Sequence, residues 1–173
     1  MTPGIIMLLR VLHIVGGVLW VGTAVFIAWF LGPSLRAVGP AGGAVMSQLT
    51  QVRRLPIWMM VFMSVTLIAG FLLYWADARV GGAAWLGSGP GRTFGIGGVL
   101  ALAGGVVGMV VTAPTGRKLG ALGATLAAAG RPPTPDERAT MEALQQRLAK
   151  AAGLVAVLVV LATMAMAVAR YTS

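Results

Sequence analysis

The sequence predicts an all-α, polytopic membrane protein in which four transmembrane helices form an antiparallel bundle. Of its 173 residues, 58% are hydrophobic and 10% are charged, which excludes a soluble globule and a disordered chain. The mean hydropathy of +0.89 supports the same conclusion. Four apolar stretches recur along the chain, and about 20 residues of helix cross a hydrocarbon core of about 30 Å.

The predicted spans cover approximately residues 5–31, 55–75, 94–113 and 153–169 of a single domain, 1–173. The first apolar run is too long for a cleavable signal peptide and has no basic residue before Arg10, so we expect a helix that is retained. No internal repeat is evident, although two hairpins of similar length are compatible with an old duplication. The chain lacks cysteine, which excludes disulfides and thiolate metal sites.

The basic residues predict the orientation. Nine follow the first and third spans: Arg36, Arg53, Arg54, Arg117, Lys118, Arg131, Arg138, Arg147 and Lys150. Four lie on the opposite side: Arg10, Arg79, Arg92 and Arg170. The positive-inside rule therefore places both basic loops in the cytoplasm and both termini in the periplasm, as in a multi-pass protein of the inner (cytoplasmic) membrane. Anionic lipid at the basic cytoplasmic face explains the net charge of +9 better than nucleic acid does.

The third and fourth helices are expected to extend into the cytoplasm as one hairpin. Thr134 to Glu137 has the pattern of a helix start, with a capping threonine, a proline and a capping-box glutamate. Gly130, followed by Pro132 and Pro133, is typical of a helix stop. Residues 41–54 are expected to form a further cytoplasmic helix. Asp77 is expected in the outer loop, solvated beside Arg79.

His13 is the one histidine, and it lies inside a predicted span, where polar groups are costly and are functional candidates. Arg10 lies one turn above it on the same helix face, and Gly17 and Trp20 follow below. Two hypotheses remain open. His13 hydrogen-bonds a neighbouring helix while Arg10 extends to the headgroups, or its imidazole is a ligand for haem iron or copper.

Met164 and Met166 lie near the predicted depth of His13 and are candidate second metal ligands. Two positions apart, they face different directions, so at most one could reach the site; core packing is the better explanation for each. The chain has 25 glycines, many inside the spans. They favour close helix packing, or they leave flat faces for a planar ligand such as a porphyrin or quinone. No acid lies within a predicted span, which disfavours carboxylate chemistry there.

Residues Leu9 to Gly22 resemble the first helix of copper-resistance-D-like membrane proteins. Their basic residue, Leu-His and Trp-x-Gly pattern is also similar to the HemJ type of protoporphyrinogen IX oxidase, and Arg53-Arg54-Leu55 adds to the likeness. The oxidase resemblance implies that His13 is an axial ligand of haem b. The copper-resistance resemblance implies copper transport or tolerance, with His13 and Met164 or Met166 as ligands. The oxidase family's third-helix lysine has no counterpart, because Ile96 stands near its place; this argues against porphyrinogen oxidation.

Three functions follow as hypotheses. The first is a small redox-associated membrane protein that holds haem b through His13, with Arg10, Gly17 and Trp20 around it. The second is a copper-handling protein that uses His13 with Met164 or Met166. The third is a non-catalytic accessory subunit of a larger membrane complex. A homodimer through the glycine faces is also plausible, because a two-fold axis would bring together one histidine from each chain.

Overall fold

A computed structural model describes residues 1–172, with every side chain in that range other than that of Pro40. Four helical segments are long and apolar enough to cross a membrane: Pro3–Ala37, Leu55–Gly87, Gly89–Ala129 and Pro135–Tyr171. The prediction of a helical membrane protein with four apolar helices is therefore confirmed.

The first long segment consists of α1 (Pro3–Phe26), the π-helical turn η1 (Ile27–Leu31) and α2 (Gly32–Ala37). The short α3 (Pro40–Ser47) and the π-helical turn η2 (Gln48–Val52) lead to α4 (Leu55–Gly87). The second half contains α5 (Gly89–Val107), the π-helical turn η3 (Gly108–Thr112), α6 (Ala113–Ala129), α7 (Pro135–Val168) and the 3₁₀ turn η4 (Ala169–Tyr171).

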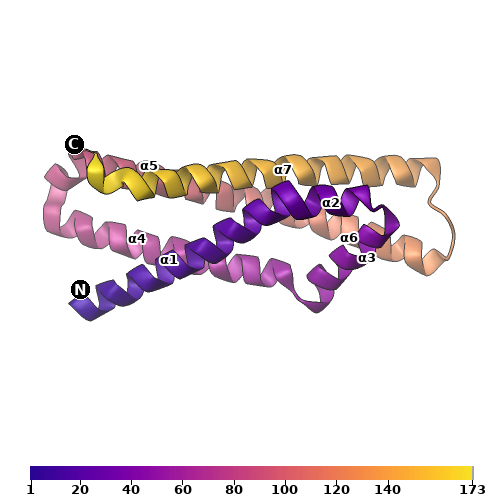
Figure 1. The fold of residues 1–173 in the computed structure, drawn as a ribbon, viewed down its shortest axis with the longest axis horizontal. Coiled ribbons are helices and arrows are strands. Elements are labelled where there is room, and N and C mark those ends of the chain that lie inside the picture. The colour runs from indigo at the N-terminus through magenta and orange to yellow at the C-terminus, as the bar shows by residue number, and fades with distance from the viewer. Residues whose placement is uncertain (173) are drawn as a thin grey trace.

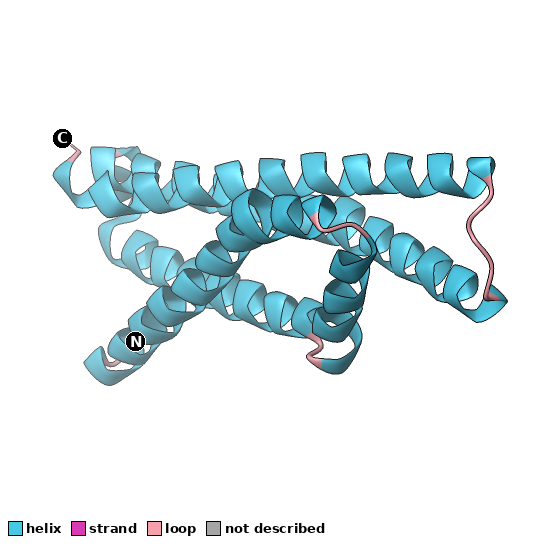
Figure 2. Ribbon diagram, turned by 45° about the vertical axis from the view of Figure 1, so that its right-hand side comes forward, coloured by secondary structure: helices cyan, strands magenta, loops and turns pink. Residues whose placement is uncertain are grey.

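The four long segments run lengthwise through an elongated molecule (Figure 1). The N- and C-termini lie at one end, where α4 also connects to α5, and the α6–α7 turn lies at the other end (Figure 1). Figure 2 shows α1 crossing α4, while α7 runs beside α5 and then α6. The core lies where the long helices meet and consists of one large side chain, Trp20, among smaller ones: Ala24, Met63, Ala101, Val155, Val159 and Ala162.

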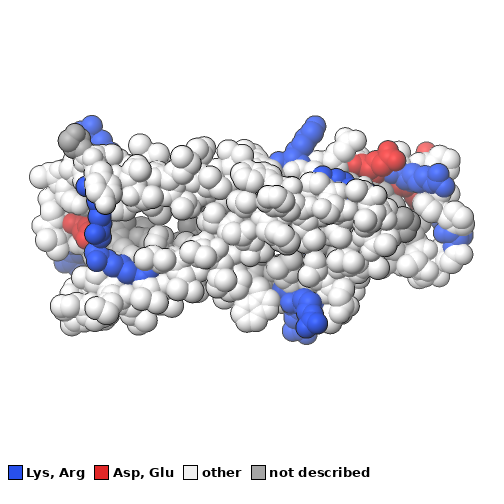
Figure 3. Space-filling view, in the orientation of Figure 1, with Lys and Arg blue, Asp and Glu red and all other residues white. Residues whose placement is uncertain are grey.

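On the visible face, charged side chains lie at the end that holds the termini and again from just past the middle to the other end, with an uncharged band between the two groups (Figure 3). Helix α7 illustrates the spacing. Lys150 and η4 residue Arg170 are 20 positions apart, or about 30 Å of helix, which matches the thickness of a hydrocarbon core. The charges therefore delimit an apolar band of the right height for a bilayer.

The ends of α6 and α7 form as the sequence predicts. Gly130 ends α6 with a φ of 61°, and the Thr134 hydroxyl accepts a hydrogen bond from the Glu137 N–H at the start of α7. The Glu137 carboxylate accepts in turn from the Thr134 N–H at 2.8 Å, which completes the capping box. Arg131 also donates two hydrogen bonds of 2.8 Å to this carboxylate. The Glu137 carboxylate thus links the start of α7 to Arg131, at the other side of the turn.

The segment expected as an outer loop is largely helical. Helix α4 continues to Gly87, with one break at Gly82, whose φ of 57° suits glycine. Asp77 is consequently helical, and the Arg79 guanidinium lies over the Trp75 ring, 4.8 Å from its centroid. Asp77 and Arg79 are both exposed, as expected of solvated residues, and the one contact ion pair within residues 1–172 is Arg131–Glu137.

A sequence pattern of the first half recurs 81 positions later in the second half, which corrects the expectation that no internal repeat is evident. Gly16-Gly17-Val18-Leu19 on α1 recurs as Gly97-Gly98-Val99-Leu100 on α5. In each half a π-helical turn and then a proline follow, Pro33 or Pro114. A proline in a helix clashes with the carbonyl group four residues before it. The turn before each proline is widened, since the Gly32 N–H donates to the Ile27 carbonyl oxygen and the Ala113 N–H to the Gly108 carbonyl oxygen, each five residues back.

Candidate ligand site around His13

The site lies where α1 crosses α4, and small residues bring the two helices together. A Cβ atom built on Gly16 would lie 2.7 Å from the Thr66 hydroxyl oxygen, and one on Gly17 would lie 3.6 Å from the Thr66 Cγ2. Thr66 is itself buried, with its hydroxyl donating to the Phe62 carbonyl oxygen at 2.7 Å. The close approach is of the kind that small residues permit in membrane helices.

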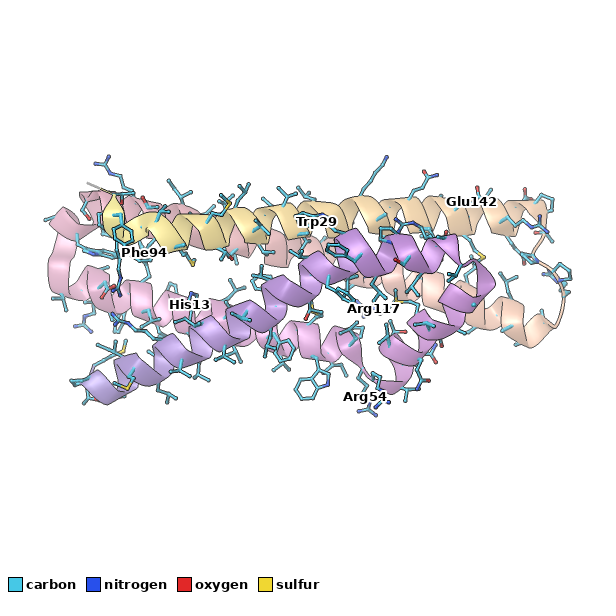
Figure 4. The ribbon with its side chains drawn as sticks, viewed as in Figure 1. His13, Trp29, Arg54, Phe94, Arg117 and Glu142 are labelled. Atoms are coloured by element: carbon cyan, nitrogen blue, oxygen red, sulfur yellow. The ribbon has the colours of Figure 1, made fainter. Side chains whose placement is uncertain are left out.

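His13 hydrogen-bonds across this crossing. Its Nδ1 is 2.8 Å from the backbone carbonyl oxygen of Thr66, and the ring is half-buried between α1 and α4 (Figure 4). A carbonyl oxygen can only accept, so Nδ1 carries the hydrogen and donates it. In the neutral imidazole the lone pair is therefore on Nε2. The first hypothesis for His13, a hydrogen bond to a neighbouring helix, matches this geometry, which also leaves one ring nitrogen available as a ligand.

Gly70, one turn beyond Thr66 on α4, makes room for the imidazole. A Cβ atom on Gly70 would lie 2.7 Å from the His13 Cε1 and 2.8 Å from Nδ1, closer than real atoms pack. The ring thus occupies the place where a side chain would otherwise be. Thr66 and Gly70 were missed from the sequence, because neither is marked by a motif and both become partners of His13 only when α1 and α4 pair.

The other residues predicted around His13 differ in burial. Trp20 is 4% exposed and belongs to the core, and Gly17 faces Thr66. Arg10 is exposed. Along α1, His13 is thus preceded by the exposed cation Arg10 and followed by the buried aromatic residue Trp20.

The two candidate methionines lie in different surroundings on α7. Met164 is 59% exposed, whereas Met166 is half-buried and would contact a Cβ on Gly97 of α5 at 3.0 Å. No hydrogen bond within residues 1–172 joins His13 to either sulfur atom. Met166 thus packs against Gly97 of α5, whereas His13 packs against Gly70 of α4, so these contacts do not bring the two candidate ligands together.

His13 offers one nitrogen, Nε2, as a possible metal ligand. Within residues 1–172, no group of three His, Asp or Glu side chains could hold a metal ion. Haem iron requires only one or two axial ligands, because the porphyrin supplies the rest. Ligating histidines ordinarily donate their other ring N–H to a carbonyl or carboxylate, which orients the ring and makes the ligand more basic. His13 and the Thr66 carbonyl have this arrangement.

Comparisons with protein-family models, curated proteins and solved structures find no match to this chain. The chemistry of the His13 site therefore carries the functional argument.

Proposed function

We propose that this protein is a small membrane protein that binds haem b through Nε2 of His13. One observation carries the proposal: the 2.8 Å hydrogen bond from Nδ1 to the Thr66 carbonyl oxygen, which directs the lone pair to Nε2. When bound, haem would supply one-electron redox chemistry at this position. The resemblance of the first helix to HemJ-type proteins supports this role for His13, whereas its resemblance to copper-resistance-D-like proteins supports copper ligation by the same residue.

Each neighbouring residue has a role in this proposal. Thr66 orients the ring through its carbonyl oxygen, and Gly70 leaves space for it. Trp20 and Gly17 keep the helix in register with α4, and exposed Arg10 would pair with a carboxylate of the ligand. Met166, or a second His13 across a two-fold axis, would supply a second axial ligand.

We propose electron transfer or haem carriage as the activity. Porphyrinogen oxidation is disfavoured, since the lysine of the oxidase family is absent and Ile96, near its place, is 58% exposed. Because the Ile96 side chain faces outwards from α5, position 96 would not contribute to a ligand site between the helices.

The proposed arrangement is an antiparallel bundle in the inner membrane with both termini in the periplasm. In this orientation, the α6–α7 hairpin extends into the cytoplasm beyond the membrane. Two features support it: the nine-to-four distribution of basic residues and the shared position of the termini at one end (Figure 1).

A second candidate function is a non-catalytic subunit of a larger membrane complex. Its support is that three glycines on α1, α5 and η3 have open space beside them: Cβ atoms on Gly22, Gly98 and Gly108 would meet nothing within 4 Å. Small residues that are not used within the chain are suited to packing against another helix. Here His13 would serve only to join α1 to α4.

The test is a haem and metal assay of the protein purified in mild detergent after expression with added haem precursor. We expect a stoichiometric haem b content by pyridine haemochrome, with no stoichiometric copper by elemental analysis. Bound copper without haem would replace the proposal with the copper-handling alternative. Protein free of both, recovered with a stoichiometric partner, would overturn it in favour of the accessory subunit.

A further inference from the structure

An amphipathic groove lies on the other side of the uncharged band from the termini, between α7 and the α5–η3 junction. It has a volume of about 520 Å³, and its polar lining includes Gln146, Arg147 and Lys150. A second hollow of about 420 Å³ adjoins it, shares Gln146 and Lys150, and brings in Arg36 at the end of α2. Together they form one surface feature, here called the α7 groove.

The α7 groove changes from apolar to polar along its length. Val107, Val111 and Leu154 form its apolar part, and Arg147 and Lys150, which precede Leu154 on α7, form its charged part. Leu154 and Lys150 are one helical turn apart, so a single ligand could place an apolar chain against Leu154 and a charged group against Lys150. This is the polarity of a phospholipid, whose acyl chains adjoin its phosphate.

The charge around the groove is predominantly positive. Arg36, Arg147 and Lys150 are three cations with one carboxylate, Glu142, among the lining residues. Within residues 1–172, the one ion pair is elsewhere, between Arg131 and Glu137, so none of the three cations is neutralised by an acid at contact distance. An anionic group would complement them.

Two of the apolar residues that line the groove are smaller than their counterparts in the first half of the internal repeat. The positions of Val107 and Val111, 81 residues earlier, carry Phe26 and Phe30, whose rings stack with centroids 6.4 Å apart. Valine is much smaller than phenylalanine. At these two positions α5 and η3 therefore carry less side-chain volume than α1 and η1 carry at the equivalent positions.

We propose that the α7 groove binds one anionic phospholipid of the membrane leaflet on the α6–α7 side. The phosphate lies between Arg147 and Lys150, with Arg36 adding to the positive field, and an acyl chain follows Val107, Val111 and Leu154. Lys150 lies about 30 Å from Arg170 along the helix, which places it at the headgroup level of that leaflet. This site is independent of the proposed haem function.

The test is native mass spectrometry of the full chain in mild detergent, with phosphatidylglycerol, phosphatidylcholine or inorganic phosphate added. The groove variants are Arg147→Gln and Lys150→Gln, singly and together. Arg138→Gln is the matched control, because it removes the same charge from an exposed position on α7 outside the groove. All three residues are exposed, so the variants should fold.

We expect one phosphatidylglycerol to remain bound, and neither phosphatidylcholine nor phosphate. Its affinity should fall about fivefold with each groove cation removed, from about 1 kcal/mol per cation near an anionic surface. It should be unchanged in Arg138→Gln. Equal loss in Arg138→Gln would show general surface attraction and overturn the proposal. Equal binding of phosphatidylcholine, or of phosphate alone, would also overturn it.

Discussion

The imidazole of His13 occupies the space that a side chain on Gly70 would need. A Cβ on Gly70 would lie 2.7 Å from the His13 Cε1, and the ring is held there by the 2.8 Å hydrogen bond from Nδ1 to the Thr66 carbonyl oxygen. The His13 ring on α1 can thus take this position because Gly70 on α4 has no side chain.

Replacing Gly70 by alanine should displace this ring. The added methyl group has no space, so His13 must rotate and lose its hydrogen bond, at a cost of about 1–3 kcal/mol. Unfolding in mixed detergent micelles measures the loss. Gly22→Ala is the control, because its methyl group meets nothing within 4 Å and should leave stability unchanged or slightly higher. Equal stability of the two variants would contradict the packing described for His13.

The pairing of α1 with α4 can be tested by cross-linking, since the chain has no native cysteine. Gly17→Cys combined with Thr66→Cys should form a disulfide on mild oxidation, because a Cβ on Gly17 would lie 3.6 Å from the Thr66 Cγ2. Gly22→Cys with Thr66→Cys is the control and should remain reduced. A mobility shift on non-reducing gels reports the bond, and equal cross-linking of both pairs would contradict this helix register.

The α6–α7 turn should respond to acid. The hydrogen bond from Arg131, followed by that from the Thr134 backbone, lowers the pKa of Glu137 from 4.5 to about 2. Because the folded pKa is depressed, the stabilisation is present above pH 4.5 and is lost as the pH falls from 4.5 to about 2. NMR titration of the Glu137 carboxyl carbon measures this directly. Arg131→Gln should raise the midpoint, and an ordinary midpoint in the unmodified protein would refute the effect.

The proposed orientation predicts which positions a membrane-impermeant thiol reagent can reach. In intact spheroplasts, Thr2→Cys should be labelled from outside, whereas Ala128→Cys, exposed near the end of α6, should be labelled only after the membrane is permeabilised. The two variants serve as controls for one another. The reverse pattern would place the α6–α7 hairpin outside.

Local features could be predicted from the sequence because local chemistry determines them. Thr134 and Glu137 form a capping box by their spacing alone, and Gly130 ends a helix because it adopts a positive φ easily. By contrast, residues 76–87 contain glycine and two charges, yet they continue α4, since a single break at Gly82 suffices to accommodate them.

The partners of His13 could not be predicted, because they depend on the register between α1 and α4. Thr66 is an unremarkable residue of an apolar span until its carbonyl oxygen meets His13, and Gly70 gains its role only from the ring against it. The internal repeat was detectable, since Gly-Gly-Val-Leu occurs twice with the same spacing to a proline and an arginine. The structure adds that both copies of the repeat contain a π-helical turn at the same position, η1 in the first and η3 in the second.

The most direct test of the haem proposal is the absorption spectrum, oxidised and reduced, of the purified protein and of His13→Ala. Leu12→Ala is the matched control, because it truncates an exposed neighbour on the same helix. We predict a Soret band that shifts on reduction in the unmodified protein and in Leu12→Ala, and its loss in His13→Ala. A colourless unmodified protein, or a Soret band unchanged by His13→Ala, would contradict ligation by His13.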